Sequence, residues 1–156
     1  MILILDGYNV AHQLPPIREA LKQSLEKGRE ALENHLVNWK KLRNFSGPIT
    51  IVYDGHQAAS VKRHGIDCLF TRSREEADDQ IIKMIRAHGN PGDAVVVSED
   101  NKVSNSCRSL GARVEPASYL LLTKPARKSV KSFIENKNSA SHNKITHDLK
   151  REWGIK

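Results

Sequence analysis

The sequence predicts an α/β fold of three layers, α/β/α, with a mostly parallel central sheet. Short apolar runs, most of them rich in Val and Ile, alternate with longer segments of helical periodicity over the first 122 residues. Strands buried on both faces of a parallel sheet have such continuous apolar runs, and their alternation with helices is typical of a doubly wound sheet. A chain of 156 residues is long enough for one domain with a substantial core.

Five apolar runs are expected to form the strands of this sheet. They cover residues 2–5, 49–53, 66–70, 94–97 and 112–114. Each run is short, as strands are, and polar or glycine-containing segments separate it from the next run.

The longest helical segment is expected between the first two strands. Its apolar residues recur at near-helical spacing. They are Ile17, Leu21, Leu25, Leu32, Leu36, Trp39 and Leu42. We expect Gly28 to bend or split this helix.

Further helices are expected after the third and fourth strands. One begins at Ser73, which fits an N-cap because Glu76 follows three residues later, and it runs to about His88. Another covers about residues 101–110, and a last turn or two of helix is expected within residues 116–122.

The basic charge of the chain is concentrated near its end. The net charge is +7, and the sequence pI is about 9.5. Residues 1–123 hold 16 Lys and Arg against 15 Asp and Glu, whereas residues 124–156 hold 9 against 3. We therefore expect a globular domain over residues 1–123 and a basic segment over residues 124–156, partly disordered or with a short helix. The excess charge favours a polyanionic partner.

Nothing in the sequence predicts export or a membrane span. Cys68 and Cys107 are far apart and in no metal-binding spacing, which fits buried thiols in a reducing compartment. The first residues have no basic region, and their short apolar run ends in a carboxylate, so they do not resemble a signal peptide. No apolar stretch approaches the roughly 18 residues that a membrane span needs. A cytoplasmic protein is expected.

Acidic residues follow or open four of the predicted elements. They are Asp6 after the first strand, Asp54 after the second, Asp78 and Asp79 near the start of the helix that Ser73 begins, and Asp100 after the fourth strand. The carboxyl ends of parallel strands meet at one edge of a sheet, so these side chains are expected to converge. Clustered carboxylates repel one another, and Mg²⁺ or Mn²⁺ would compensate their charge.

Each acidic site also has a purely structural explanation. Asp6 precedes a glycine and fits a turn, and Asp100 fits an N-cap. Acids in the first turns of a helix favour its dipole. On a helical wheel Asp78 falls beside the buried face and Asp79 points nearly opposite. Because four structural explanations would be needed at the same edge, the sequence favours a shared functional role.

Such a cluster fits metal-dependent hydrolysis of phosphodiesters. One or two divalent ions can activate water, stabilise charge on the phosphate oxygens and stabilise the leaving group. There is no obvious Ser-His-Asp set and no phosphate-binding loop. Tyr8 stands where a phosphatase of the haloacid dehalogenase type would need a second Asp.

The motifs LDGYNV, VYDG, FTRSREEADDQI and VVVSED, followed by GARV, resemble those of the NYN domain in the PIN-like nuclease superfamily, and within it the small bacterial YacP-like group. Their order and spacing match over about residues 1–122. The resemblance implies a PIN-like fold and a metal-dependent ribonuclease. It also implies that Asp6, Asp78 and Asp100 bind the metal.

The same resemblance implies roles for further residues. Asn9 and Ser98 would support the metal-binding acids, and Asp79 and Asp54 would be additional acidic members of the site. Glu99 departs from the family's pattern, because a small polar residue is expected at its position.

Basic and aromatic residues near these motifs are candidate contacts to nucleic acid. Lys62 and Arg63, in a predicted loop after the second strand, are expected to contact a phosphate backbone across the mouth of the site. Arg72 and Arg74 precede the acidic helix and would either contact RNA or offset the carboxylates. Tyr8 is expected to stack on a base. In the basic segment, Lys128 and Lys131 would add affinity for RNA.

The sequence therefore predicts a metal-dependent endoribonuclease that cuts single-stranded or loop RNA, because a duplex hides its bases. Two alternatives stay open. The domain would bind RNA or ribosomes without cutting if an arginine or lysine neutralised the acidic cluster in place of a metal. A toxin-like nuclease controlled by a protein partner would have the same site.

Overall fold

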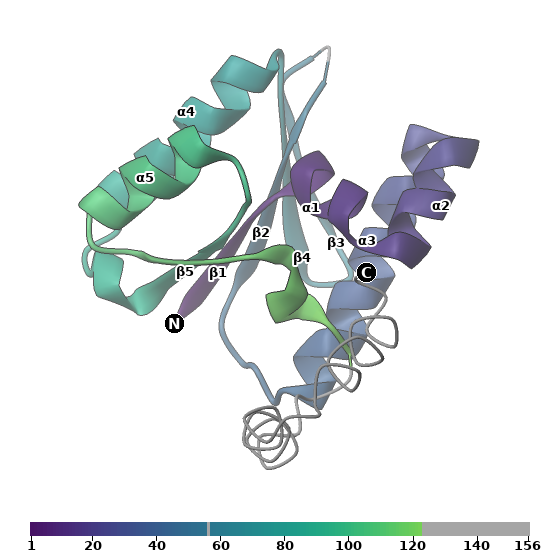
Figure 1. The fold of residues 1–156 in the computed structure, drawn as a ribbon, viewed down its shortest axis with the longest axis horizontal. Helices are drawn as coiled ribbons and strands as arrows, with labels where there is room; N and C mark the ends of the chain where they lie inside the picture. Colours follow the sequence, from purple (N-terminus) through teal and green to yellow (C-terminus); the bar gives the residue numbers. More distant parts are fainter. Residues whose placement is uncertain (56, 123–156) are drawn as a thin grey trace, which may run out of the picture. The chain divides into compact units, whose positions relative to one another are not determined.

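A six-stranded sheet forms the centre of the computed structural model, which describes residues 1–55 and 57–122 (Figure 1). Its strands are β1 (Ile2–Asp6), β2 (Ile49–Asp54), β3 (Ala59–Arg63), β4 (Ile66–Thr71), β5 (Ala94–Val97) and β6 (Arg113–Glu115). They lie in the order β3-β4-β2-β1-β5-β6. The basic segment over residues 124–156, with its expected short helix, lies outside the described residues.

The sheet is mostly parallel, as predicted. Every pair of neighbours is parallel except β3 and β4, which form an antiparallel edge. The sequence did not predict β3, because its residues are almost all exposed and contain no apolar run. The predicted loop at Lys62 and Arg63 is therefore wrong, since both residues belong to this strand.

Helices cover both faces of the sheet. Between β1 and β2 lie α1 (Gly7–Gln13), α2 (Pro15–Gln23) and α3 (Leu25–Leu42), and these pack on the face that contains Leu3 and Leu5. The opposite face, which contains Ile4, is covered by α4 (Arg74–Ala87) and α5 (Asn101–Ser109). Two short 3-10 helices, η1 (Pro91–Asp93) and η2 (Ala117–Leu120), complete the described elements. The predicted three-layer α/β/α fold is confirmed.

The long helical segment breaks at Ser24. The Ser24 backbone is extended, and its side chain accepts a hydrogen bond of 3.0 Å from the backbone N–H of Lys27, which caps α3. Gly28 is instead buried where α2 meets α3, and a Cβ there would overlap the side chain of Leu21. The expectation that Gly28 splits the helix is wrong; this glycine lets the two helices pack closely.

Gly7 has a similar packing role beside the first acidic residue. It begins α1 directly after β1, so the expected turn at Asp6 is absent. A Cβ on Gly7 would lie 2.5 Å from Cδ1 of Tyr53 in β2. The glycine therefore lets α1 approach the sheet closely, which fixes the direction in which the chain leaves Asp6.

The start of α4 agrees with the prediction. Ser73 is the N-cap, and its hydroxyl accepts a hydrogen bond of 3.1 Å from the backbone N–H of Glu76. The Glu76 carboxylate in turn accepts one of 2.7 Å from the backbone N–H of Arg72. This reciprocal arrangement satisfies backbone donors near the first turn and fixes where the helix begins.

Both cysteines are free and buried in the core, as the sequence predicted. Cys68 packs on the side of α1–α3, and Cys107 packs on the side of α4 and α5. In the part of the chain that the structure describes, no helix is both long enough and apolar enough to cross a membrane.

Gly28→Ala is expected to lower the free energy of unfolding by about 1–3 kcal/mol, because the added methyl group overpacks the junction with Leu21. Helix propensity alone predicts the opposite sign, a gain of about 1 kcal/mol. Asn34→Ala, at an exposed position of α3, is the matched control and should be stabilising by a few tenths of a kcal/mol, about the difference in propensity. Denaturant unfolding of both variants measures the effect, and a gain in both would contradict the close packing.

Candidate active site at the carboxyl edge of the sheet

The predicted acids lie where the winding of the sheet reverses. From β1 the chain proceeds to β2 and β4 on one side, and α4 then carries it across the other face to β5, on the far side of β1. Ligands of doubly wound sheets bind at the carboxyl ends of the strands beside such a reversal. Asp6 ends β1, and Ser98 follows the neighbouring strand β5.

Ser98 connects two of the acidic residues. Its hydroxyl donates a hydrogen bond of 3.1 Å to Oδ2 of Asp6 and accepts one of 3.0 Å from the backbone N–H of Asp100. The side chain of Ser104 donates a bond of 3.3 Å to the Ser98 carbonyl. Ser98 is only 3 % exposed, so its hydroxyl is held firmly in this position. The arrangement fits the supporting role that the resemblance implies.

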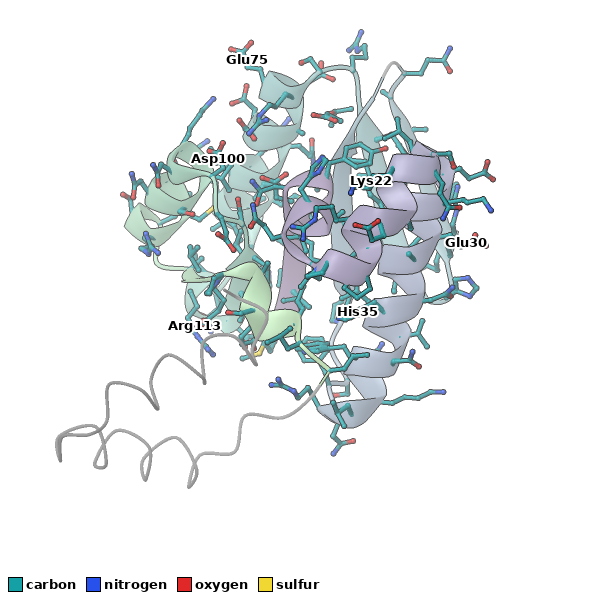
Figure 2. All side chains as sticks on the ribbon, turned by 45° about the vertical axis from the view of Figure 1, so that its right-hand side comes forward. Lys22, Glu30, His35, Glu75, Asp100 and Arg113 are labelled. Carbon is teal, nitrogen blue, oxygen red and sulfur yellow. The ribbon has the colours of Figure 1, made fainter. Side chains whose placement is uncertain are left out.

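Asp78 and Asp100 lie near the starts of two helices. Asp78 is buried on α4, as the helical wheel predicted, whereas Glu75 points away from the sheet (Figure 2). Asp100 is the N-cap of α5, and its Oδ1 accepts a hydrogen bond of 3.1 Å from the backbone N–H of Val103. The structural explanation of Asp100 is therefore correct, and its second oxygen, Oδ2, accepts a hydrogen bond from Arg74.

Burial and mutual repulsion raise two of the three acids' pKa values. Burial raises the pKa of Asp6 to about 6, and the charges of Asp78 and Asp100 add to the effect although the Ser98 hydroxyl opposes it. Burial and the charge of Asp100 also raise the pKa of Asp78. Burial acts in the same direction on Asp100, but the hydrogen bond from Val103 and the Arg74 guanidinium outweigh it, so its pKa is lowered.

Arg74 provides positive charge to this acidic cluster of Asp6, Asp78 and Asp100. Its Nη2 donates a hydrogen bond of 3.1 Å to Oδ2 of Asp100, and its charge also acts on Asp6 and Asp78. This confirms the expectation that Arg74 offsets the carboxylates. Arg72 instead forms an ion pair of 3.6 Å with Glu76.

The oxygen atoms of the acidic cluster and of the Ser98 hydroxyl suit a hard divalent cation, because carboxylate and hydroxyl oxygens are the ligands that Mg²⁺ and Mn²⁺ prefer. The raised pKa of Asp6 reflects burial first and repulsion by Asp78 and Asp100 second, and a bound cation would oppose both effects. Within residues 1–55 and 57–122, however, no three Asp, Glu, His or Cys side chains are grouped closely enough to hold a metal ion. Metal binding would require small shifts of these side chains, including the movement of Arg74.

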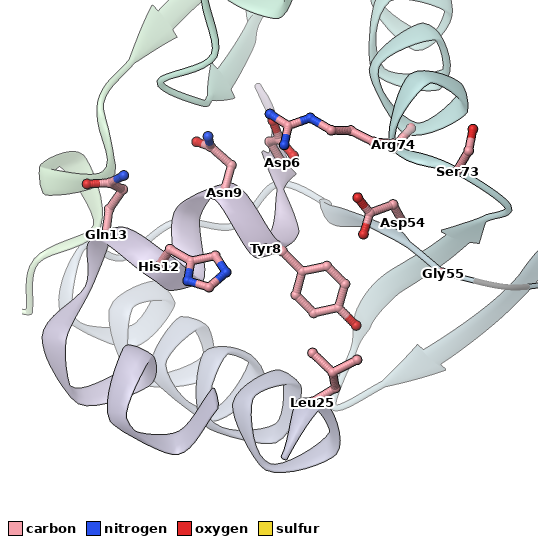
Figure 3. A pocket seen from close by; sticks show the side chains of 11 residues that line it. Asp6, Tyr8, Asn9, His12, Gln13, Leu25, Asp54, Gly55, Ser73 and Arg74 are labelled. Carbon is pink, nitrogen blue, oxygen red and sulfur yellow. The ribbon is translucent and has the colours of Figure 1, made fainter. Parts of the chain in front are cut away.

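A cavity of about 490 Å³ opens beside Asp6 (Figure 3). Asp6, Asp54, Ser73 and Arg74 line it together with residues of α1 and the start of α3, among them Tyr8, Asn9, His12, Gln13 and Leu25. The structure thus brings the predicted residues Asp54, Tyr8 and Asn9 to one cavity. The volume is in the range of cavities that hold small ligands.

Asn9 connects the first motif to the loop after β5. Its Oδ1 accepts a hydrogen bond of 2.9 Å from the backbone N–H of Glu99. The Glu99 carboxylate accepts one of 3.1 Å from the backbone N–H of Ala117, beside η2. Glu99 therefore has a structural use at the position where it departs from the family's pattern. Asn9 holds the site together, and its amide nitrogen remains a donor.

Asp79 lies outside this cavity. It is 66 % exposed and forms an ion pair of 3.6 Å with Lys102 of α5. The predicted outward orientation is confirmed. Its proposed part in the chemistry stays a prediction.

Lys62 and Arg63 do not border the acidic cluster. Arg63 pairs in register with Ile66, at the end of β4 opposite to the carboxyl edge. Lys62 forms an ion pair of 3.0 Å with Asp67, and Arg63 forms one of 3.6 Å with Glu33. The expectation that they contact a phosphate across the mouth of the site is therefore wrong. Lys128 and Lys131 lie outside the described residues.

The sequence analysis missed a polar cluster behind the cavity. Glu33 is only 2 % exposed, and its Oε2 accepts a hydrogen bond of 3.1 Å from the hydroxyl of Tyr53. Arg29, one turn before it on α3, donates a bond of 2.8 Å to the hydroxyl of Tyr8. A signal was present, since Glu33 lies between Leu32 and Leu36 on the apolar side of the predicted helix. Gln13 and the exposed Leu25 were also missed as residues of the cavity.

Asp6→Asn is expected to raise the free energy of unfolding by about 1–2 kcal/mol at pH 7.5, in EDTA. The pKa of Asp6 is raised to about 6, so the folded protein binds more protons than the unfolded chain between about pH 4 and 6. The contribution of Asp6 to stability therefore falls as the pH rises through this range. Asparagine carries no charge, so the gain should disappear as the pH is lowered to 4.

Denaturant unfolding at pH 4 and 7.5 measures this difference. Asp79→Asn, an exposed neutralisation on the same sheet edge, is the matched control and should change stability by less than about 0.5 kcal/mol. Destabilisation by Asp6→Asn at pH 7.5 would show that Asp6 stabilises the fold as a charged group.

Comparison with known proteins identifies the family. The model of the YacP-like NYN domain matches residues 3–154, and thus extends through most of the basic segment. The uncharacterized protein YacP of Bacillus subtilis (strain 168) is 27% identical over 94 residues, which are 57% of this chain and 54% of that protein. The matched stretch thus spans about half the length of this curated relative.

Two solved structures have the same fold. A crystal structure of Rae1 (YacP) from Bacillus subtilis aligns with a TM-score of 0.64 and 21% identity over 99% of this chain and 95% of that chain. A crystal structure of a mutant of the same protein aligns with a TM-score of 0.65 and 22% identity over 92% of this chain and 87% of that chain. The motifs, the fold and the family match agree: this chain belongs to the YacP-like NYN domain family.

Proposed function

We propose that this chain is a metal-dependent endoribonuclease that cuts unpaired RNA. The observation that carries the proposal is the electrostatic coupling of Asp6, Asp78 and Asp100 at the reversal point of the sheet. Burial and the charge of Asp100 raise the pKa of Asp6 and Asp78, and such carboxylates are costly for stability. The N-cap role explains Asp100 but neither of the other two acids. A cationic ligand would remove this cost, and functional sites are where such strained groups concentrate.

Asp6, Asp78 and Asp100 would hold Mg²⁺ or Mn²⁺. The ion would activate water and stabilise the negative charge that develops on the phosphate. Ser98 would keep Asp6 oriented through its hydrogen bond, and Asn9 would keep the β5–α5 loop in register with β1. Asp54, at the wall of the cavity, and Asp79, which does not line it, would add negative potential that attracts cations.

RNA is the proposed substrate because the cavity has contacts for more than a phosphate. Tyr8 lines it and offers a ring on which a base can stack, which requires an unpaired strand. Arg74 lies at the acidic end of the cavity, where a phosphate group would approach. The excess of positive charge in residues 124–156, including Lys128 and Lys131, would add salt-dependent affinity. A cytoplasmic location and an association with ribosomes belong to the same proposal.

One observation favours a second candidate, an RNA-binding domain that does not cut. Arg74 already neutralises part of the acidic cluster, as the alternative requires. The side chain is 66 % exposed, however, so it is free to move when a stronger cation binds. The two candidates therefore differ in whether a divalent ion displaces the guanidinium from Asp100.

The first experiment tests cleavage directly. The protein is incubated with end-labelled single-stranded RNA in Mg²⁺ or Mn²⁺, with EDTA as the control. We expect cleavage that Asp6→Asn and Asp78→Asn each reduce at least about 100-fold, since each removes a negative ligand while preserving shape. Lys62→Gln, at the opposite edge of the sheet, is the matched surface control and should keep activity. Cleavage that persists in both aspartate variants would show that another nuclease is responsible.

The second experiment measures metal binding without RNA. Arg74→Gln is expected to increase affinity for Mn²⁺ at least about threefold in calorimetric titrations, because it removes a positive charge that competes with the ion at Asp100. Arg72→Gln, two residues away and paired with Glu76, is the matched control and should change affinity less. Failure of both the native chain and Arg74→Gln to bind Mn²⁺ would favour the domain that binds without cutting.

A further inference from the structure

We propose that the cavity beside Asp6 is a nucleobase subsite, in which the base next to the scissile phosphate packs against the Tyr8 ring and the Leu25 side chain. The base edge would meet Gln13 and His12 at the end of α1. This inference rests on the proposed nuclease function and adds to it a determinant of where the RNA is held. The residues that carry it belong to α1 and α3, which contribute no acid to the acidic cluster.

The Tyr8 ring is held in position before any ligand binds. Its hydroxyl accepts a hydrogen bond of 2.8 Å from Nη1 of Arg29. Its ring lies 5.0 Å from the Tyr53 ring, centroid to centroid, at an angle of 46°. The Arg29 guanidinium is itself placed over the Phe70 ring at 5.5 Å. A ring restrained on one side and open to a cavity on the other suits stacking, because little conformational freedom is lost on binding.

Leu25 provides an apolar surface that no packing requirement explains. It is the first residue of α3 and is 57 % exposed, the highest value among the exposed large apolar side chains of the described residues. The Ser24 cap fixes the start of α3 and so places Leu25 at the rim of the cavity. In Figure 3 the hydroxyl end of Tyr8 points toward Leu25. Together they form an apolar side that a flat, uncharged ring can cover.

The lining of the cavity combines two kinds of group that a nucleotide needs. Asp6, Asp54 and Arg74 provide charged groups suited to a phosphate and its cation. Leu25 provides an apolar surface, and Gln13 and His12, at the end of α1, provide exposed hydrogen-bonding groups. About 490 Å³ is more than a phosphate alone needs and is within the range for a drug-sized ligand.

The structure has a second cavity, between α4 and α5, that serves as a comparison. Lys83 and Arg86 bring positive charge to it and Asp79 negative charge, but none of the described residues that line it is aromatic. It offers contacts for a phosphate backbone without a surface for stacking. The combination of a restrained ring, an exposed leucine and neighbouring acids occurs at the cavity beside Asp6.

Nuclear magnetic resonance in EDTA tests the subsite independently of cleavage. Adenosine and uridine 5′-monophosphates should shift the Leu25 methyl signals and the Gln13 side-chain amide, and ribose 5-phosphate should not. Tyr8→Leu and Leu25→Ser should each weaken nucleotide binding at least about fivefold. Leu42→Ser, another exposed leucine of the same helix, is the matched control and should bind normally. Equal shifts with ribose 5-phosphate, or equal affinity in Leu25→Ser and Leu42→Ser, would overturn the proposal.

Cleavage of RNA with one abasic nucleotide tests the same subsite in the full reaction. An abasic residue beside the cut should slow the native chain about tenfold, whereas Tyr8→Leu, already lacking the ring, should respond less than about twofold. Equal slowing in both proteins would contradict the assignment of Tyr8. If the native chain does not cut at all, the nuclease proposal fails, and the nucleotide titration in EDTA still decides whether a base binds here.

Discussion

The arrangement of the site depends on one constraint: Asp6 ends a buried central strand, where water cannot fully solvate its charge. β1 lies between β2 and β5, and Leu3, Ile4 and Leu5 are completely or almost completely buried. A carboxylate that directly follows such residues is removed from solvent unless protein groups or an ion replace the water. Ser98 provides one hydrogen bond, which is too little to offset burial, and the pKa of Asp6 remains raised.

The surrounding structure brings more negative charge to Asp6 and keeps it there. α4 and α5 begin beside it and bring Asp78 and Asp100 close. Asp100 is the N-cap of α5, where the helix dipole favours its charge. Arg74, the first residue of α4, adds positive charge beside these carboxylates. The fold therefore tolerates the acidic cluster because several weak interactions each offset part of its negative charge. A ligand can replace any one of these interactions. A cluster whose charges were all paired within the protein would leave no position for a ligand.

The sequence was most informative where burial dictates residue type. The runs that form β1, β2, β4 and β5 are apolar because both faces of each strand are covered, and the acids that follow them were located correctly. β3 was missed because its exposed residues have no such constraint. The periodicity of the α2–α3 region placed Leu25 with the buried leucines, but the break at Ser24 changes the helix direction and leaves Leu25 exposed. The Ser24 cap and the close packing at Gly28 depend on contacts between helices, which one sequence does not display.

The contacts behind the cavity connect its two sides. Glu33 is buried with Tyr53 and the Cys68 thiol as neighbours, and burial, with the charge of Glu33 in second place, raises the pKa of both. Tyr53 contacts the Tyr8 ring and would also contact any side chain on Gly7, so one residue of β2 sets both the entry into α1 and the orientation of Tyr8. The direction in which α1 leaves Asp6 and the position of the aromatic ring are consequently not independent. A change at Tyr53 or Glu33 would move both the acid-bearing strand end and the apolar side of the cavity, although neither residue lines the cavity itself.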